Sequence, residues 1–501
     1  MSAAIPADLS DFIARLRASE ASPFRAGGAP PTSEASALRE RSERPFGREA
    51  EPSAEGAVYV SRAPGRLDVM GGIADYSGAL VLQWPIREST RVALMRHPDR
   101  VLNISSVSAG CVRRVDVPLD VFDSGRASYE QVRSWFDASP DRHWAAYVAG
   151  VFQVLAREES LTLDGGATVV VESDVPEGKG VSSSAAIEAA TMEAVLAAWS
   201  LPMDARMRAI RCQQVENLVV GAPCGVMDQM ASICGEQARL MALLCQPAEF
   251  QGTIALPGGL GVWGIDSGIR HAVTGADYGA VRVGAFMGYR VLADLAGLPV
   301  TPGDRPRHVR VDDPRWHGYL ANVTPDVFAG FEQRIPVSLA GDAFLARYGG
   351  TTDPVTDVDS ATNYAVRTPT AHPVYEHRRV TEWARQLAAP EADAAPVLGE
   401  LMFQSHASYS ACGLGSDGTD LLVQLAREAA ASEGIFGAKI TGGGSGGTVA
   451  VLGRRDAGPR VAQIARDYEA RTGRATYLFE GSSPGAAAVG ALRIDFGALG
   501  T

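Results

Sequence analysis

A loop of small residues stands between a predicted strand and a predicted helix. Residues 174–184 read D-V-P-E-G-K-G-V-S-S-S and follow a β-type run at 167–173. Gly178 and Gly180 would form a tight turn, and the start of the helix would offer unpaired N–H groups and its positive dipole end to an anion. Three hydroxyls that could bind phosphate oxygens or Mg²⁺ follow: Ser182, Ser183 and Ser184. The loop predicts a phosphate site, and a helix that merely starts with small residues is the structural alternative.

Three further segments combine charged residues with glycines. Residues 62–76 read R-A-P-G-R-L-D-V-M-G-G-I-A-D-Y, and residues 215–230 read V-E-N-L-V-V-G-A-P-C-G-V-M-D-Q-M. Residues 437–451 read G-A-K-I-T-G-G-G-S-G-G-T-V-A-V, in which five of the six positions 442–447 are glycine. Such a run is entropically unfavourable unless the backbone adopts positive φ or contacts a ligand. A flexible linker is the alternative, but the β-type run after the glycines argues against it.

In this order the four segments resemble the galactokinase family of the GHMP kinase superfamily. The family patterns are A-P-G-R-V-N-L-I-G-E-H-T-D-Y, P-x-G-x-G-L-S-S-S-A, P-C-G-I-M-D-Q and M-T-G-G-G-F-G-G, and the resemblance extends over roughly residues 57–495. The serine loop differs from both G-x-x-x-x-G-K-[ST] and G-x-G-x-x-G. The resemblance implies a kinase that uses ATP and Mg²⁺ to phosphorylate the anomeric hydroxyl of a sugar.

The resemblance also implies a role for each site residue. Asp228 would face the anomeric hydroxyl as a base or as an orienting group, and Arg66 would pair with it and steady the phosphoryl group. Glu216 would hold Mg²⁺ together with Ser183 or Ser184. The residues expected at sugar hydroxyls are Asp75, Gly225 and Tyr278, and those expected to close the phosphate site are Gly443 and Gly444. For Tyr278, a place in the core is an equally good interpretation.

Gly72 and Ile73 replace the Glu-His pair of galactokinases. In that family the pair lies beside the C6 hydroxymethyl group, so its loss predicts a sugar without that group, and L-arabinose is D-galactose without it. Ile73 would present an apolar wall that removes water from a C6 hydroxyl without replacing its hydrogen bonds. Segments 215–230, 263–271, 409–419 and 479–486 resemble the kinase half of plant L-arabinokinases. The alternatives are a galactokinase, another sugar-1-kinase and a non-catalytic sugar sensor, and the intact catalytic and phosphate-loop residues argue against the sensor.

The resemblance implies an α/β (α+β) fold of two domains with the active site between them. The first, at 56–257, would be like ribosomal protein S5, and the second, at 258–501, would be ferredoxin-like. Residues 7–18 have amphipathic helical spacing, whereas 20–55 have the composition of a partly disordered arm within residues 1–55. Strands are expected at 57–61, 79–84, 90–95, 167–173 and 262–266, and helices at 144–156 and 184–199.

Composition excludes several classes of partner. The chain has 501 residues and a net charge of −12, which disfavours nucleic acid and anionic membranes. Six cysteines without a C-x-x-C pair indicate neither a disulfide framework nor a zinc site and favour the cytoplasm. No apolar run reaches the ~18 residues of a membrane span, and the N-terminus lacks a signal-peptide pattern. The expected ligands are a small sugar and ATP, and the oligomeric state is open.

Overall fold

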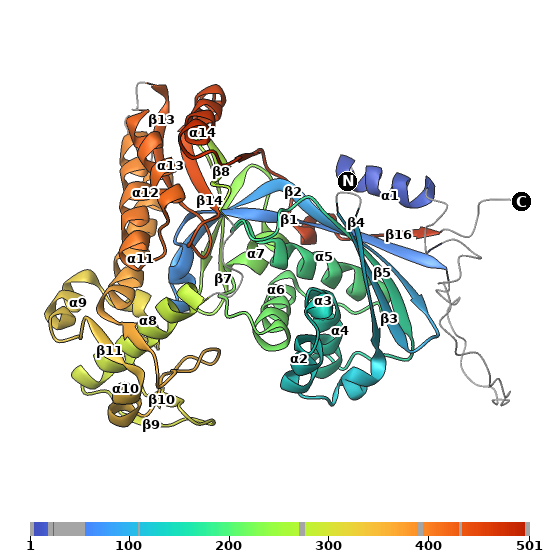
Figure 1. Ribbon diagram of the computed structural model, residues 1–501, viewed down its shortest axis with the longest axis horizontal. Coiled ribbons are helices and arrows are strands. Elements are labelled where there is room, and N and C mark those ends of the chain that lie inside the picture. The colour runs from blue at the N-terminus through green and yellow to red at the C-terminus, as the bar shows by residue number, and fades with distance from the viewer. Residues whose placement is uncertain are drawn as a thin grey trace, which may run out of the picture.

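The computed structural model describes residues 5–18, 24, 56–108, 111–269, 276–388, 394–429 and 433–495 (Figure 1). The arm predicted at 20–55 therefore lies almost entirely outside the described residues. The described chain forms two main β-sheets surrounded by helices. Among the helices in these ranges, none is both long enough and apolar enough to cross a membrane.

The first sheet has eight strands in the order β16-β1-β2-β5-β3-β4, with β6 beside β2 and β7 beside β6. Neighbouring strands are antiparallel except for β3 and β5. The strands are β1 (Ala57–Met70), β2 (Leu80–His97), β3 (Val101–Ser108), β4 (Cys111–Pro118), β5 (Gly166–Ser173), β6 (Arg239–Leu244), β7 (Glu249–Ala255) and β16 (Ala491–Asp495). β2 is continuous where the sequence suggested two runs, and β1 continues through most of the first motif.

The two faces of this sheet are covered by different helices (Figure 1). Along β2, Val92 and Leu94 belong to the core shared with helices α4 and α5, whereas Ala93 belongs to the core shared with α1. This alternation is the period of two expected of a strand. The helices of this part of the chain are α1 (Ala7–Ala18), α2 (Tyr129–Asp137), α3 (Pro140–His143), α4 (Ala146–Glu158), α5 (Ser183–Ala198), α6 (Ala205–Gln214) and α7 (Met227–Cys234). The predicted helix at 7–18 is confirmed.

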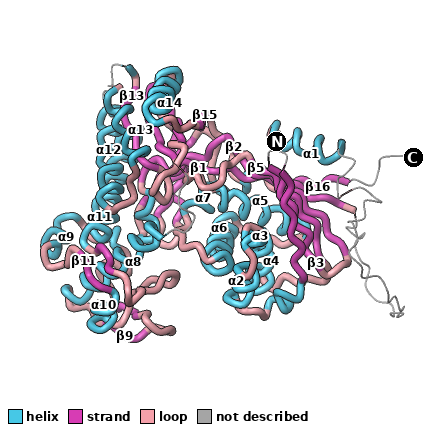
Figure 2. Tube along the Cα trace, viewed as in Figure 1, coloured by secondary structure: helices cyan, strands magenta, loops and turns pink. Residues whose placement is uncertain are grey.

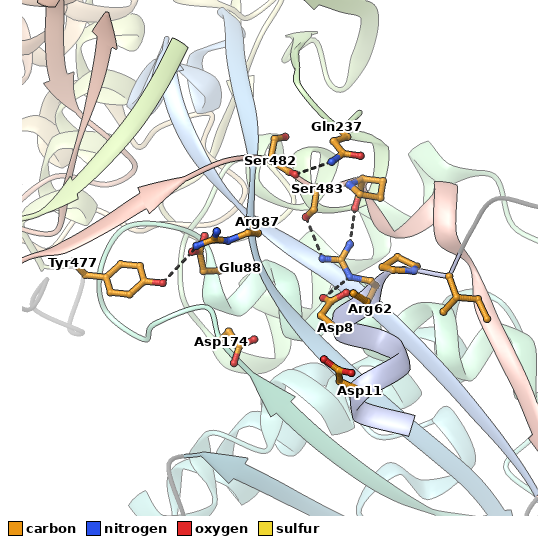
Figure 3. Close-up of a pocket in the computed structure, with 14 residues that line it drawn as sticks. Asp8, Asp11, Arg62, Arg87, Glu88, Asp174, Gln237, Tyr477, Ser482 and Ser483 are labelled. Atoms are coloured by element: carbon orange, nitrogen blue, oxygen red, sulfur yellow. Dashed lines mark hydrogen bonds and ion pairs between the residues drawn. The ribbon is translucent and has the colours of Figure 1, made fainter. Parts of the chain in front are cut away.

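Buried polar contacts hold α1 on the sheet in addition to its apolar face. Arg62 of β1 is 1% exposed and donates from Nε to Asp8 Oδ2 at 2.9 Å (Figure 3). Its two terminal nitrogens donate to the carbonyl of Pro484 and to Ser483 Oγ, both at 3.1 Å. A cavity of about 730 Å³ lies beside these contacts. Arg62 therefore joins the N-terminal helix to β1 and to the segment that precedes β16.

The second sheet is antiparallel, with the order β13-β14-β8-β15. Its strands are β8 (Leu260–Asp266), β13 (Ile435–Ile440), β14 (Thr448–Arg454) and β15 (Tyr477–Glu480). One face packs on α13 (Asp417–Glu428) and α14 (Gly458–Thr472), and the other on α11 (Arg367–Ala388) and α12 (Ala394–Ala411). Leu67 and Trp84 of the first sheet share the core of that second face, so one apolar core connects the two sheets.

The segments that lie between α8 (Ala276–Leu295) and α11 in the sequence form a smaller lobe (Figure 2). It consists of β9 (Val300–Pro302), β10 (Val309–Val311), α9 (Pro325–Glu332), β11 (Ser338–Ala340), α10 (Gly341–Tyr348) and β12 (Asn363–Ala365).

The chain changes sheet twice. β7 ends at Ala255 in the first sheet, and β8 begins at Leu260 in the second. At the other end, the short helix α15 (Ala486–Val489) and strand β16 return to the first sheet, where β16 pairs with β1. We therefore propose a division near residue 257 in which residues 486–495 belong to the first domain, because a second domain at 258–501 would contain a strand of the first sheet.

Candidate active site

The segments that carry the predicted chemistry meet at a cavity of about 630 Å³. Predicted site residues that line it are Arg66, Asp75, Gly178, Gly180, Ser182, Ser183, Ser184, Glu216, Gly225, Asp228, Tyr278 and Gly443. The larger cavity beside α1 contains none of these residues. The smaller cavity is therefore the candidate active site.

Arg66 and Asp228, which are far apart in sequence, both line this cavity and are in contact. Arg66 follows an irregularity in the pairing of β1 with β2, and Asp228 lies in the first turn of α7. Arg66 Nε and a terminal nitrogen donate to Asp228 Oδ1 at 3.0 and 2.7 Å, and its other terminal nitrogen donates to the carbonyl of Gly180 at 2.7 Å. Burial opposes the charge of Arg66, but Asp228 outweighs it and raises the pKa of Arg66.

The predicted phosphate loop has the backbone that its glycines allow. Gly178 and Gly180 have φ of +71° and +70°, and Ser182, the N-cap of the 16-residue helix α5, has φ of +61°. The hydroxyl of Ser182 is buried and has no hydrogen-bond partner among the residues that the structure describes. An unpaired hydroxyl beside the N-terminus of a long helix is an arrangement that suits phosphate oxygens.

The second glycine turn packs directly on this loop. A Cβ atom added at Gly442 would lie 2.7 Å from the carbonyl of Gly180, and one at Gly447 would lie 2.8 Å from the carbonyl of Lys179. Lys179 Nζ is 2.7 Å from Asp266 Oδ2, at the end of β8. The glycines therefore permit a close contact between the two domains, and the ion pair between Lys179 and Asp266, which the sequence gave no sign of, adds a polar contact.

Asp75 marks one end of the cavity. It lies in the 3₁₀ turn Gly72–Ser77 and is 4% exposed, and a Cβ atom at Gly225 would lie 1.8 Å from its Oδ2. Burial and the nearby charge of Asp228 raise the pKa of Asp75 to about 7, although Arg282 opposes the shift. Tyr278 lines the same end, and its ring meets Tyr76 edge to face at 5.8 Å.

Arg282 holds this end of the cavity together, and sequence reasoning missed it. It donates to both carboxylate oxygens of Asp353 at 2.7 and 2.6 Å, and both side chains are at most 4% exposed. Its third nitrogen donates to the carbonyl of Cys224 at 3.1 Å, and its guanidinium lies 5.4 Å from the ring centre of Tyr76. Arg282 thereby fixes the Cys224–Gly225 loop against Asp75. Its position four residues after Tyr278 was the only available signal.

Glu216 is placed to hold a divalent cation. It lies in the π-helical turn Val215–Val220 and accepts from Gln229 Nε2 at 2.7 Å and from the hydroxyl of Ser184. Burial and the charge of Asp228 raise the pKa of Glu216 to about 7. A carboxylate beside a serine hydroxyl and an anion-binding helix terminus is an all-oxygen donor set of the kind Mg²⁺ prefers, with substrate phosphates as its other ligands.

An aromatic slot forms the other end of the cavity. Trp144 and Tyr147 line it together with Ile187, and Arg113 lies with its guanidinium carbon 5.0 Å from the centre of the Trp144 ring. Trp144 caps the short helix α3, whereas the predicted helix at 144–156 is observed as α4 at Ala146–Glu158. Nucleobases stack on aromatic rings, so Trp144 and Tyr147 are the candidates for contact with the base of ATP.

Three residues do not lie where the sequence placed them. Ile73 is 1% exposed and packs in the core with Tyr76 and Tyr409, so the prediction that it forms an apolar wall facing the sugar is wrong. Gly72 is also buried and does not line the cavity. Gly443 lines the cavity, whereas Gly444 lies against Leu414 instead. For Gly72 and Ile73 the reason is the direction of the 3₁₀ turn. Asp75 lines the cavity, whereas Gly72 and Ile73 contact Tyr409 of the second domain.

Known families match three stretches of this chain. Residues 146–236 match the GHMP kinases N terminal domain, residues 392–470 match the GHMP kinases C terminal family, and residues 45–96 match the galactokinase galactose-binding signature. The chain belongs to the GHMP kinases. Along the chain, the signature comes first, the N-terminal domain second and the C-terminal family third, which is the order that the four sequence segments predict.

Among its relatives, this GHMP kinase is 44% identical over 488 residues to L-arabinokinase of Arabidopsis thaliana, covering 88% of this chain and 47% of that protein. The chain thus spans about half the length of the Arabidopsis protein. It is 29% identical to galactokinase of Chloroflexus aggregans, covering 83% and 89% of the two chains. The crystal structure of Lactococcus lactis galactokinase complexed with galactose has the same fold, with a TM-score of 0.65, 19% identity and coverage of 87% and 95%.

Substitution of Trp144 by alanine tests the aromatic slot of this GHMP kinase. Stacking of a base on an aromatic side chain contributes ~1–3 kcal/mol, so we expect the KM for ATP to rise at least ~5-fold and the KM for the sugar to stay within ~2-fold. Initial rates at varied ATP and fixed sugar measure this. The matched control is Trp135→Ala, because Trp135 also lies under an arginine, Arg142, but outside the cavity. Equal ATP effects in both variants would place the nucleobase elsewhere.

Proposed function

We propose that this GHMP kinase transfers the γ-phosphoryl group of ATP to the anomeric hydroxyl of L-arabinose, giving L-arabinose 1-phosphate, ADP and a proton. The observation that carries the proposal is the position of Arg66, which donates both to Asp228 and to the carbonyl of Gly180. One cation thereby joins the carboxylate expected at the sugar hydroxyl to the loop expected at the phosphates.

In this proposal the protein acts mainly by positioning and by neutralising charge, because phosphoryl transfer passes through a loose transition state. The N-terminus of α5 would bind the phosphates through its N–H groups and the serine hydroxyls. Asp228 would hold the anomeric hydroxyl toward the γ-phosphorus and either take its proton or orient it. Arg66, which is buried and always cationic, would lie beside the transferred group.

The other assigned residues would complete the two ligand sites. Asp75 and the N–H of Gly225 would bind ring hydroxyls, with Tyr278 beside them. Glu216 and Ser184, or Ser183 in its place, would hold Mg²⁺, which when bound neutralises phosphate charge. The cytoplasm, expected from the cysteine pattern, would supply both substrates. The free thiols are Cys212, Cys224, Cys234, Cys245 and Cys412.

L-Arabinose is favoured as the substrate by two observations. The chain is 44% identical to a protein named L-arabinokinase and 29% identical to one named galactokinase. In addition, the positions that carry a Glu-His pair in galactokinases are Gly72 and Ile73, and neither offers a side chain that can hydrogen-bond a C6 hydroxyl.

Two measurements on the purified protein test the proposal. The first follows ADP release with L-arabinose, D-galactose, D-galacturonate and N-acetylgalactosamine, and we expect L-arabinose to give the highest kcat/KM. The second is ³¹P NMR of the product, which should show a phosphate coupled to the anomeric proton. Highest activity on D-galactose would support the galactokinase alternative, and sugar binding without ADP release would support the sensor.

The raised pKa of Asp75 predicts a pH profile. An ionised carboxylate accepts hydrogen bonds from sugar hydroxyls, whereas the protonated form, which dominates below a pKa of about 7, loses one acceptor. We therefore expect kcat/KM for the sugar to fall as the pH drops through 7, up to ~10-fold for each further unit. Asp75→Asn should have low activity and a flatter profile. Glu216 has a raised pKa in the same range, so the KM for Mg·ATP is measured separately, and an unchanged wild-type kcat/KM from pH 8 to 5.5 would contradict the assignment.

A further inference from the structure

The backbone of Gly72 lies in contact with the hydroxyl of a buried tyrosine from the second domain. A Cβ atom added at Gly72 would lie 1.3 Å from Tyr409 Oη and 2.5 Å from its Cζ. Gly72 also has φ of +45°, a conformation that residues with a side chain rarely adopt. Tyr409 belongs to α12 and is 0% exposed. The space that a side chain at position 72 would need is therefore already filled, by an atom from a residue that is remote in sequence.

The hydroxyl of Tyr409 is held by two hydrogen bonds. It accepts from the N–H of Ile73 at 2.7 Å and donates to the carbonyl of Gly442 at 3.2 Å. The ring is fixed as well, because Lys439 Nζ lies 5.0 Å from its centre and the ring of His372 meets it edge to face at 5.3 Å. Tyr409 therefore cannot move away from Gly72 without breaking contacts on several sides.

These bonds connect the two ends of the candidate active site. Ile73 lies in the 3₁₀ turn that carries Asp75 at the sugar end. Gly442 lies against the phosphate loop, since a Cβ atom there would be 2.7 Å from the carbonyl of Gly180 and 3.3 Å from a terminal nitrogen of Arg66. The hydroxyl of Tyr409 is thus hydrogen-bonded both to the turn that carries Asp75 and to the turn that supports the phosphate loop.

We propose that Tyr409 is a positioning residue that fixes the turn carrying Asp75, and that the close fit between Tyr409 and Gly72 restricts the site to the smaller sugar. The identity of that sugar rests on the proposed function, but the positioning of Asp75 does not. Without the hydroxyl, the N–H of Ile73 loses its partner, and the turn is held less firmly, by the bonds of Gly71 and Gly72 to Glu376 and Asp68. Small displacements of a bound reactant lower the rate strongly, and a looser turn leaves room for a C6 group.

The first test is Tyr409→Phe, which keeps the ring and removes both hydrogen bonds. We expect the KM for L-arabinose to rise at least ~5-fold, the KM for ATP to stay within ~2-fold, and the preference for L-arabinose over D-galactose to fall by ~3-fold or more, as the turn loosens. The matched control is Tyr289→Phe, since Tyr289 is also buried and donates to one acceptor, Asp313, outside the cavity. An unchanged KM for the sugar, or equal changes in both KM values, would overturn the proposal.

The second test asks whether the effect of a side chain at position 72 depends on the side chain at position 409. Gly72→Ala should lower kcat/KM by more than ~10-fold in the native background, but by less than ~2-fold when Tyr409→Ala has already removed the side chain that it meets. Gly473→Ala controls for the backbone, because Gly473 has φ of +69° and open space around its Cβ position. The same loss of kcat/KM from Gly72→Ala in both backgrounds would contradict the proposed steric contact between positions 72 and 409.

The outcomes separate this proposal from the proposed function. If the native protein prefers a sugar other than L-arabinose, the KM comparison is made with that sugar. It then still decides whether Tyr409 positions the sugar end, while the substrate assignment alone fails.

Discussion

Replacement of Asp228 by asparagine should lower kcat by at least ~10², which is the scale of lost general-base or electrostatic assistance. Asparagine keeps the shape and one oxygen for Arg66, but it removes the negative charge and the proton acceptor. Because Asp228 is 20% exposed at its side chain and faces the cavity, the sugar loses its partner while the phosphate loop is untouched. The KM for ATP should therefore stay within ~2-fold.

The measurement needs a control for stability, since Arg66 is buried and its pairing with Asp228 is weakened. Thermal unfolding should show a lower Tm for Asp228→Asn, and rates are compared well below it. Asp204→Asn is the matched control, because Asp204 caps α6 by accepting from the N–H of Met207 and asparagine caps helices equally well. If Asp228→Asn kept more than half of the native rate, the assignment of Asp228 would be wrong.

The native protein should favour L-arabinose over D-galactose by ~10-fold or more in kcat/KM, with ~10² as the upper range, because apolar surroundings reject an added hydroxyl only to that extent. Gly72 and Ile73 do not line the cavity, and neither has a side chain that could replace the hydrogen bonds that the C6 hydroxyl of galactose makes with water. Because Ile73 is buried, it is not the apolar wall that the sequence suggested, but the expected preference for L-arabinose stays the same. Tyr409 closes the turn, and neither position 72 nor position 73 offers a polar side chain. Both sugars are compared on one enzyme preparation, and equal or reversed preference would end the L-arabinose assignment.

Restoration of the Glu-His pair is a poor converse experiment. A glutamate at position 72 would overlap the hydroxyl of Tyr409, and the positive φ of Gly72 disfavours any side chain there. Any such variant would have to change Tyr409 as well.

The sequence predicted the parts of the site that are local and repetitive. Glycines at 178, 180 and 442 indicate a backbone that approaches another group, and the structure places Gly442 against Gly180 across the two domains. The meeting of Arg66 with Asp228 followed from the family resemblance rather than from spacing, since 162 residues separate them. The amphipathic spacing of α1 and the β-type runs of β5 and β8 likewise specified local elements.

The contacts that the sequence did not predict are long-range pairs of ordinary residues. Arg282 and Asp353 lie in segments without any local pattern, and their pairing depends on how the lobe between α8 and α11 folds back. The turn that places Ile73 is held by a hydrogen bond that the N–H of Ile73 donates to the hydroxyl of Tyr409, 336 residues away. Apolar character alone does not distinguish a cavity wall from a core position. The pairing of β16 with β1 could not be predicted either, because the sequence pattern of a strand does not indicate which other strand it pairs with.

The return of β16 to β1 has a consequence for synthesis. A growing chain can form the contacts of β1 with β2 early, but the edge of β1 that binds β16 stays unpaired until residues 491–495 have left the ribosome. At typical elongation rates this interval is roughly 20 to 90 s, during which the exposed edge can pair with another chain. The first domain is thus completed only after the second has been made, so truncation near the C-terminus should impair the domain that is encoded first.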